Sequence, residues 1–236
     1  MQLPLSIQIL RTLKQGKRQL SDEALSSVVS YVSSQRGEGE TFCNRAGQPD
    51  LYYTLFGWML TYVLQLSSNS RQRSGLLNQV ETCKLDTLHQ TVYALCQQLH
   101  RIMDYGVLGW RPSVESLFIQ FLAAYQHHGS GTGMNAWAVT LTHRRSEDTL
   151  RQLLTLQHPS GGFLAHPQAP VPDLLSTAVA LFVLSLHREV PPIDATSFIF
   201  AHWLSDGGFA PTLLDTQSDV EYVFYGLLAM GALKRK

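Results

Sequence analysis

The stretch LSDGGFAPTLLDTQSDVEYVFYGLLAMGAL, residues 204–233, decides the fold. It holds a Gly-Gly-Phe turn at 207–209, a short polar segment, and a run from Val220 to Leu233 that is apolar on nearly every side. Glycine tolerates the left-handed conformation that ends a helix, and the Asp219 carboxylate can accept hydrogen bonds from the free amides of a first helical turn. The stretch therefore predicts a helix end, a turn and a second, buried helix.

The same order of turn, capping residue and apolar helix recurs upstream. The caps are Asp50, Ser113 and Asp173, and with Asp219 they lie about 63, 60 and 46 residues apart. A second Gly-Gly-Phe turn stands at 161–163, and weaker glycine-containing turns stand at 37–42 and 106–110. This spacing is typical of helical-hairpin repeats.

Helices of a different kind are expected between these apolar runs. Their apolar residues fall at helical spacing on one face only, as in Leu25, Val28, Val29 and Val32. Such one-sided helices are expected near 3–14, 25–32, 88–102, 150–154 and 198–204. Alternation of one-sided and wholly apolar helices predicts two concentric layers, and so an all-α toroid or solenoid rather than an ordinary bundle.

Composition and charge exclude several classes of protein. Hydrophobic residues make up 44% of the 236 residues, and Lys+Arg equal Asp+Glu at 18 each, with no basic stripe of the kind that nucleic acid requires. Three cysteines without CxxC spacing argue against a disulfide framework or a zinc module. The uncharged run 51–66 is shorter than the roughly 20 residues of a spanning helix. With no leader-like start, a cytoplasmic protein without a membrane span is expected, and 67–74 and 129–133 are interpreted as flexible connectors.

These repeats, above all 153–186 and 198–233, resemble those of protein prenyltransferase β subunits and squalene or oxidosqualene cyclases. The resemblance implies one domain over 1–236, an α/α toroid whose aromatic-lined central cavity holds isoprenoid chains. A full ring of that family has about six hairpins. Four good hairpins and an ambiguous segment at 135–143 predict a trimmed or incomplete ring.

The resemblance also implies where catalytic groups would stand. In such prenyltransferases an Asp and a Cys near the start of one inner helix and a His near the start of another hold zinc. The corresponding positions here are Asp219, Glu221 and Tyr53, so two of three expected ligands are replaced and no metal or other cofactor is predicted. The segment 215–219 does not match the Asp-rich acid motif of the cyclases.

The starts of the inner helices are expected to converge on one mouth of the ring. Capping alone accounts for Asp50, Ser113 and Asp173, whereas Asp219 with Glu221 brings two carboxyl groups together, which can raise one pKa and create a general acid. These two are the candidate catalytic residues, and plain capping of the helix is the alternative interpretation of this pair too. Ordinary core packing is the alternative interpretation of the inner-helix aromatics. The candidate cavity-lining residues are Tyr53, Phe56, Trp58, Phe118, Phe182, Tyr222 and Tyr225.

Two hypotheses follow from the sequence. In the first, the protein binds an isoprenoid or other apolar ligand in the cavity, and whether it also transforms the ligand stays open. If it is an enzyme, it acts without the usual zinc site, and the aromatic walls stabilise cations. In the second, it is a non-catalytic helical-repeat scaffold that holds a protein partner or a second copy of itself at the mouth or at the open edge of the ring.

Overall fold

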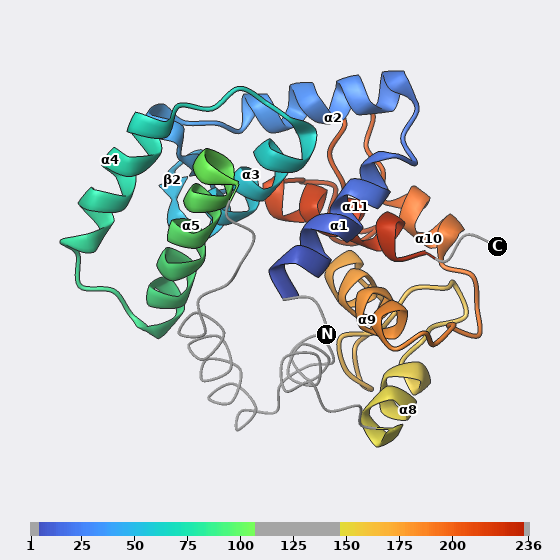
Figure 1. Ribbon diagram of the computed structural model, residues 1–236. Coiled ribbons are helices and arrows are strands. Elements are labelled where there is room, and N and C mark those ends of the chain that lie inside the picture. Colours follow the sequence, from blue (N-terminus) through green and yellow to red (C-terminus); the bar gives the residue numbers. More distant parts are fainter. Residues whose placement is uncertain (1–4, 107–146, 234–236) are drawn as a thin grey trace.

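The computed structural model describes residues 5–106 and 147–233. These parts consist of α-helices joined by connecting segments (Figure 1). The connections include a short 3-10 helix, η1 (Glu38–Glu40), and an antiparallel pair of two-residue strands, β1 (Phe42–Cys43) and β2 (Pro49–Asp50). The predicted all-α fold is confirmed. The repeat that begins at Ser113, and the segment 135–143, lie outside the described residues.

The helices follow the predicted order of one-sided and buried elements. Their bounds are α1 (Leu5–Lys17), α2 (Asp22–Ser34), α3 (Leu51–Leu64), α4 (Ser70–Glu81), α5 (Thr87–Tyr105), α8 (Glu147–Thr155), α9 (Leu174–Leu186), α10 (Thr196–Ala201) and α11 (Val220–Ala232). Helices α3, α9 and α11 are buried on most sides, whereas α2 buries only Val28 and Val32. Helix α11 packs against α9 on one side and against α3 on the other, so the last repeat closes onto the first.

The three described inner helices begin at the aspartates that the sequence marked. The Asp50 carboxylate accepts from the backbone amides of Tyr52 and Tyr53, and the Asp173 carboxylate accepts from Ser176. Asp219 accepts from the amide of Tyr222 at 3.1 Å. Each such cap contributes about 0.5–2 kcal/mol to stability and fixes the first turn of its inner helix.

The turns before these helices share one geometry. Isolated antiparallel bridges join residue pairs six positions apart, Arg36 with Phe42, Gln157 with Phe163, and Trp203 with Phe209. The three phenylalanine rings are fully buried. The turn at 37–42, which has only a weak glycine signature in the sequence, is therefore built like the two Gly-Gly-Phe turns.

Each buried phenylalanine is also tied to its own inner helix or, at Phe209, to the residue just before the helix cap. The amides of Phe42 and Phe163 donate to the hydroxyls of Thr54 and Thr177, at 2.9 and 2.8 Å. The amide of Phe209 donates to Ser218 Oγ at 2.9 Å. The ring of Phe209 lies so close to Gly226 that a Cβ there would fall 2.6 Å from it, so this position needs a glycine. The turns thus lock outer to inner helices.

One predicted connector is wrong in part. The sequence predicts a flexible loop over 67–74, but α4 begins at Ser70. The Asn69 side chain caps this helix by accepting from the amides of Arg71 and Gln72. The buried face of α4 includes Arg73, which is 3% exposed and pairs with Asp104 of α5. An arginine in the inward position removes the apolar stripe by which a helix is recognised. The expected helix at 198–204 is also shorter, because α10 ends at Ala201.

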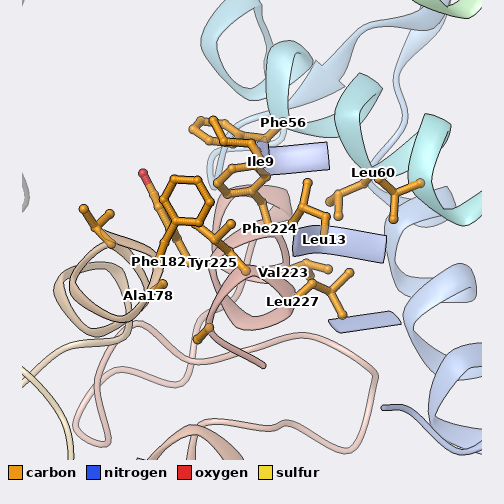
Figure 2. Close-up of a cluster of buried hydrophobic side chains, with 14 of the residues drawn as sticks. Ile9, Leu13, Phe56, Leu60, Ala178, Phe182, Val223, Phe224, Tyr225 and Leu227 are labelled. Atoms are coloured by element: carbon orange, nitrogen blue, oxygen red, sulfur yellow. The ribbon is translucent and has the colours of Figure 1, made fainter. Parts of the chain in front are cut away.

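Helix α1 completes the core between the first and last inner helices. Figure 2 shows Ile9 and Leu13 of α1 among Phe56 of α3 and Phe224 and Leu227 of α11. The two backbones cross closely, since a Cβ at Gly231 would lie 1.8 Å from the carbonyl oxygen of Thr12. A side chain at this crossing would push α1 off α11.

We therefore expect Gly231→Ala to lower the free energy of unfolding by about 1–3 kcal/mol, the usual range for an overpacked core. Gly75→Ala is the matched control, because Gly75 lies inside α4 with no atom within 4 Å of an added Cβ. The control should gain roughly 0.5–1 kcal/mol from the better helix propensity of alanine. Urea denaturation of both variants tests this, and equal stability would contradict the close crossing.

Candidate functional site

The beginnings of α3 and α11 meet and bring polar side chains from the first and last repeats together. Tyr52 of α3 donates its hydroxyl hydrogen to Oε1 of Glu221 in α11 at 2.7 Å. Glu221 is 8% exposed and Asp219, two residues earlier, is 1% exposed. Both candidate catalytic carboxyl groups therefore lie at this junction, nearly removed from water.

Arg45 fixes the second of these carboxyl groups. It stands in the connection between β1 and β2, and its Nε donates to Asp219 Oδ2 at 2.8 Å. Its Nη1 donates to Asp215 Oδ2 at 2.9 Å, and its guanidinium lies over the ring of Tyr222 at 5.2 Å. Bonds to two carboxylates and an aromatic face hold the guanidinium in one orientation, so Arg45 joins the first repeat to the last.

The carboxyl groups of Glu221 and Asp215 have different environments. Burial raises the pKa of Glu221 to about 7 from its usual 4.5, and the nearby charge of Asp219 adds to this, whereas the Tyr52 bond and Arg45 act in the opposite direction. Burial also raises the pKa of Tyr52, which keeps its hydroxyl protonated as a donor. The amide of Gln217 and then Arg45 lower the pKa of Asp215. Near neutral pH, Glu221 can thus carry an acidic proton beside an ion pair.

Aromatic rings surround the Glu221 carboxyl. Tyr52 contacts Tyr53 and Phe56 edge to face, with centroids 5.6 and 5.0 Å apart. Phe56 in turn lies 5.9 Å from Tyr225, which lies 6.3 Å from Tyr222. Tyr52, Tyr53 and Tyr222 are half-buried, while Phe56 and Tyr225 are buried. The three half-buried tyrosines, here called the tyrosine rim, thus adjoin a buried apolar cluster.

The remaining predicted cavity residues are spread more widely. Phe182 lies on α9 near Tyr225, as Figure 2 shows. Trp58 is fully buried on another face of α3, where its indole Nε1 donates to the backbone oxygen of Glu40 at 2.8 Å. That bond ties α3 to η1, away from the Glu221 carboxyl. Phe118 lies outside the described residues.

Sequence reasoning missed two of the polar partners in this site. Arg45 comes from a polar loop and meets Asp219 across 174 sequence positions. Tyr52 reads as one more core aromatic on an inner helix, and its bond to Glu221 spans 169 positions. No local pattern encodes either pairing. The sequence shows Asp215 in the segment Asp215-Thr-Gln-Ser-Asp219, but it gives no sign that Asp215 binds Arg45.

The residues at the zinc positions do not fit a zinc ion. The Asp219 carboxylate already binds a guanidinium, Glu221 accepts a phenol hydrogen bond, and Tyr53 is a phenol whose pKa is raised by burial. Zinc needs deprotonated Cys, His or carboxylate ligands, and a fixed cation beside the site repels it. Among residues 5–106 and 147–233, no group of three or more His, Cys, Asp or Glu is placed to hold a metal ion.

Comparison with known proteins identifies the family. Residues 119–235 match the family described as the prenyltransferase alpha-alpha toroid domain, a range that contains α8 to α11 and both candidate acids. This match supports a prenyltransferase and squalene cyclase-like toroid family for the chain, and the predicted toroid fold is confirmed. No curated protein matches the chain. In the part of the chain that the structure describes, no helix is long and apolar enough to cross a membrane.

The raised pKa of Glu221 predicts a pH dependence of stability. Between the usual pKa of 4.5 and about 7, the unfolded state ionises Glu221 while the folded state keeps it protonated, so stability falls as pH rises through this window. The loss amounts to about 3 kcal/mol. We expect Glu221→Gln to abolish it, leaving the variant close to the parent at pH 4 and more stable at pH 8. Urea denaturation across this range tests the expectation, and parallel stability curves for variant and parent would contradict it.

The Arg45 ion pair predicts a large effect from a surface-accessible residue. Arg45→Met leaves Asp219 buried without its cation, which should cost about 2–4 kcal/mol of unfolding free energy. Arg151→Met removes an exposed pair, whose partners Arg151 and Asp148 are 73% and 84% exposed, and should cost less than about 0.5 kcal/mol. Thermal denaturation at neutral pH compares the two. A loss at Arg45 no greater than that at Arg151 would contradict the role of Arg45.

Proposed function

We propose that this toroid binds an isoprenoid or other unsaturated apolar ligand at the mouth formed by α3 and α11, and that Glu221 protonates it. The observation that carries the proposal is one buried carboxyl group, Glu221, which is 8% exposed, accepts a bond from Tyr52 and has its pKa raised to about 7. A general acid works best when its pKa lies near the operating pH.

The surroundings of Glu221 suit a reaction that develops positive charge. Protonation of a carbon–carbon double bond adds the carboxyl proton to one carbon and leaves a carbocation on the other, with Glu221 as the carboxylate. The faces of aromatic rings attract cations, and Tyr52, Tyr222 and Tyr225 lie around this carboxyl group. Loss of a proton from a neighbouring carbon back to Glu221 would give a neutral product and restore the acid.

Asp219 has a supporting role in this proposal. Its carboxylate pairs with Arg45, and its charge raises the pKa of Glu221. Of the two candidate acids, Glu221 is therefore the proton donor and Asp219 the group that maintains it. This division rests on the different neighbours of the two groups, a guanidinium at Asp219 and a phenol at the buried Glu221.

One observation favours the second function, a scaffold for a protein partner. Below the tyrosine rim, Phe56, Phe224 and Tyr225 are at least 90% buried by one another and by Ile9 and Leu13 (Figure 2). Side chains of the chain itself thus fill this depth of the ring, so a ligand would contact chiefly the half-buried Tyr52, Tyr53 and Tyr222. A scaffold needs no more than such a filled core.

Ligand binding and conversion separate the two functions. The protein is incubated with polyprenyl alcohols, polyprenyl diphosphates and a polyene hydrocarbon, and the products are identified by mass spectrometry. Native mass spectra before and after denaturation show which compounds bind. The variants are Glu221→Gln and, as a control, Glu23→Gln at an exposed position in the first turn of α2.

We expect the parent and both variants to bind the same ligand, and Glu221→Gln alone to lose conversion by at least a factor of about 100, as for removal of a general acid. Equal conversion by Glu221→Gln and the control would exclude Glu221 as the acid. Absence of both a bound compound and a product would contradict the proposal and favour the scaffold.

A further inference from the structure

A cavity lined mostly by polar side chains lies between α4 and α5, on the other side of α3 from α11 (Figure 1). The two helices run antiparallel, because Ser70 of α4 bonds to Asp104 of α5 and Ser74, one turn further on, lies opposite His100. The cavity has a volume of about 250 Å³, which is small for a ligand pocket. It therefore suits a small polar molecule rather than an isoprenoid chain.

One end of this cavity is built to donate hydrogen bonds. Arg73, which is 3% exposed, donates from Nε to His100 Nδ1 at 3.3 Å. That bond needs a lone pair on Nδ1, so the hydrogen of the neutral ring is on Nε2 and points at Ser74 Oγ, 3.2 Å away. The Ser74 hydroxyl then keeps its own hydrogen for an acceptor in the cavity. The charge of a buried guanidinium is thus relayed through the ring to a donor at the cavity wall.

Two observations favour this direction of the hydrogen bonds. Asp104 Oδ2 lies 3.2 Å from His100 Nδ1, but this carboxylate already accepts from Arg73 and from Ser70, so it does not need a hydrogen from the ring. Burial lowers the pKa of His100 below its usual 6.5. Asp104 opposes this shift, while Arg73 and Arg101 add to it, so the ring is neutral near pH 7.

The other end of the cavity carries negative charge. Glu81 and Tyr93 line it, and burial and then the charge of Glu81 raise the pKa of the Tyr93 phenol, so the two groups lie close together. Arg101 lines the cavity at the donor end, where its charge acts on His100. Glu81 follows Ser74 by seven positions on α4, which at a rise of 1.5 Å per residue is about 10 Å. A donor end and an anionic end thus lie about two helical turns apart.

We propose that this cavity binds a small linear zwitterion, an ω-amino acid, with its carboxylate at Ser74 and Arg101 and its ammonium at Glu81 and Tyr93. A hydrogen bond of about 3 Å at each end leaves about 4–5 Å between the charged groups of the ligand, which a four-carbon ω-amino acid spans. A dianion or a dication would meet a like charge at one end. This inference goes beyond the proposed function, since it concerns other helices and a polar ligand.

Isothermal titration calorimetry of the full chain with 4-aminobutanoate tests the inference. Butanoate and butylamine, each of which offers only one charge of the probe, are the matched ligands. The site variants are Ser74→Ala and Glu81→Gln, and the controls are Ser33→Ala and Glu23→Gln at exposed positions of α2. Because alanine and glutamine favour helices, we expect every variant to keep the fold of the parent.

We expect 4-aminobutanoate to bind the parent and both controls with a Kd on the order of 1 mM or below, at least about tenfold more tightly than either matched ligand. Ser74→Ala should weaken this binding by about tenfold, because it removes a hydrogen bond to a charged group. Glu81→Gln should reduce the affinity for 4-aminobutanoate to within about twofold of that for butanoate.

Three results would overturn the proposal. The first is equal affinity of the parent for 4-aminobutanoate and butanoate, and the second is unchanged binding in Ser74→Ala. The third is no binding of the probe at up to about 20 mM, which would mean that the polar side chains serve only to hold α4 to α5.

Nitrogen NMR of the His100 ring tests the donor end without any ligand. At neutral pH the ring hydrogen should be on Nε2, and the resonances missing in His100→Gln identify the residue. A hydrogen on Nδ1 would mean that the ring donates to Asp104, and it would overturn the relay and the proposal with it.

Discussion

The contact between the first and last inner helices is the constraint on which the rest of the structure depends. Helix α11 must pack against α3 as well as α9, and across this junction Tyr52 bonds to Glu221 and Arg45 bonds to Asp219. Without the junction, each apolar helix would leave a face in water. With it, two carboxyl groups from the last repeat are buried beside groups from the first. Packing of the last inner helix on the first and formation of the site are thus one event.

The contact between α3 and α11 also explains why the site differs chemically from a zinc site on the same fold. At the beginning of α11 the guanidinium of Arg45 pairs with the Asp219 carboxylate. The second acid, Glu221, then lies in an environment too poor in water and in further cations to favour its charged form. A zinc site activates an anionic nucleophile, whereas this arrangement retains a proton. The chemistry that we propose for this site is accordingly that of an acid.

Much of the fold could be predicted from the sequence, because its signals are local. Aspartate caps followed by wholly apolar runs mark α3, α9 and α11, and the Gly-Gly-Phe turns mark the ends of the hairpins. The prediction failed where the buried residue is polar, as at Arg73 in α4. In the site, local spacing brought Asp219 and Glu221 to notice as a pair. Their partners Arg45 and Tyr52 are distant in sequence, and only the contact between the first and last repeats brings them near.

The most direct test of the account is the titration of the Glu221 carboxyl itself. Carbon NMR of protein labelled at the glutamate side-chain carboxyl would follow each resonance with pH, and the resonance missing in Glu221→Gln identifies the residue. We predict that this carboxyl titrates near pH 7, well above the usual 4.5 of a glutamate. A Glu221 titration close to 4.5 would mean that the group is charged at neutral pH, and it would contradict both the acid and the site built around it.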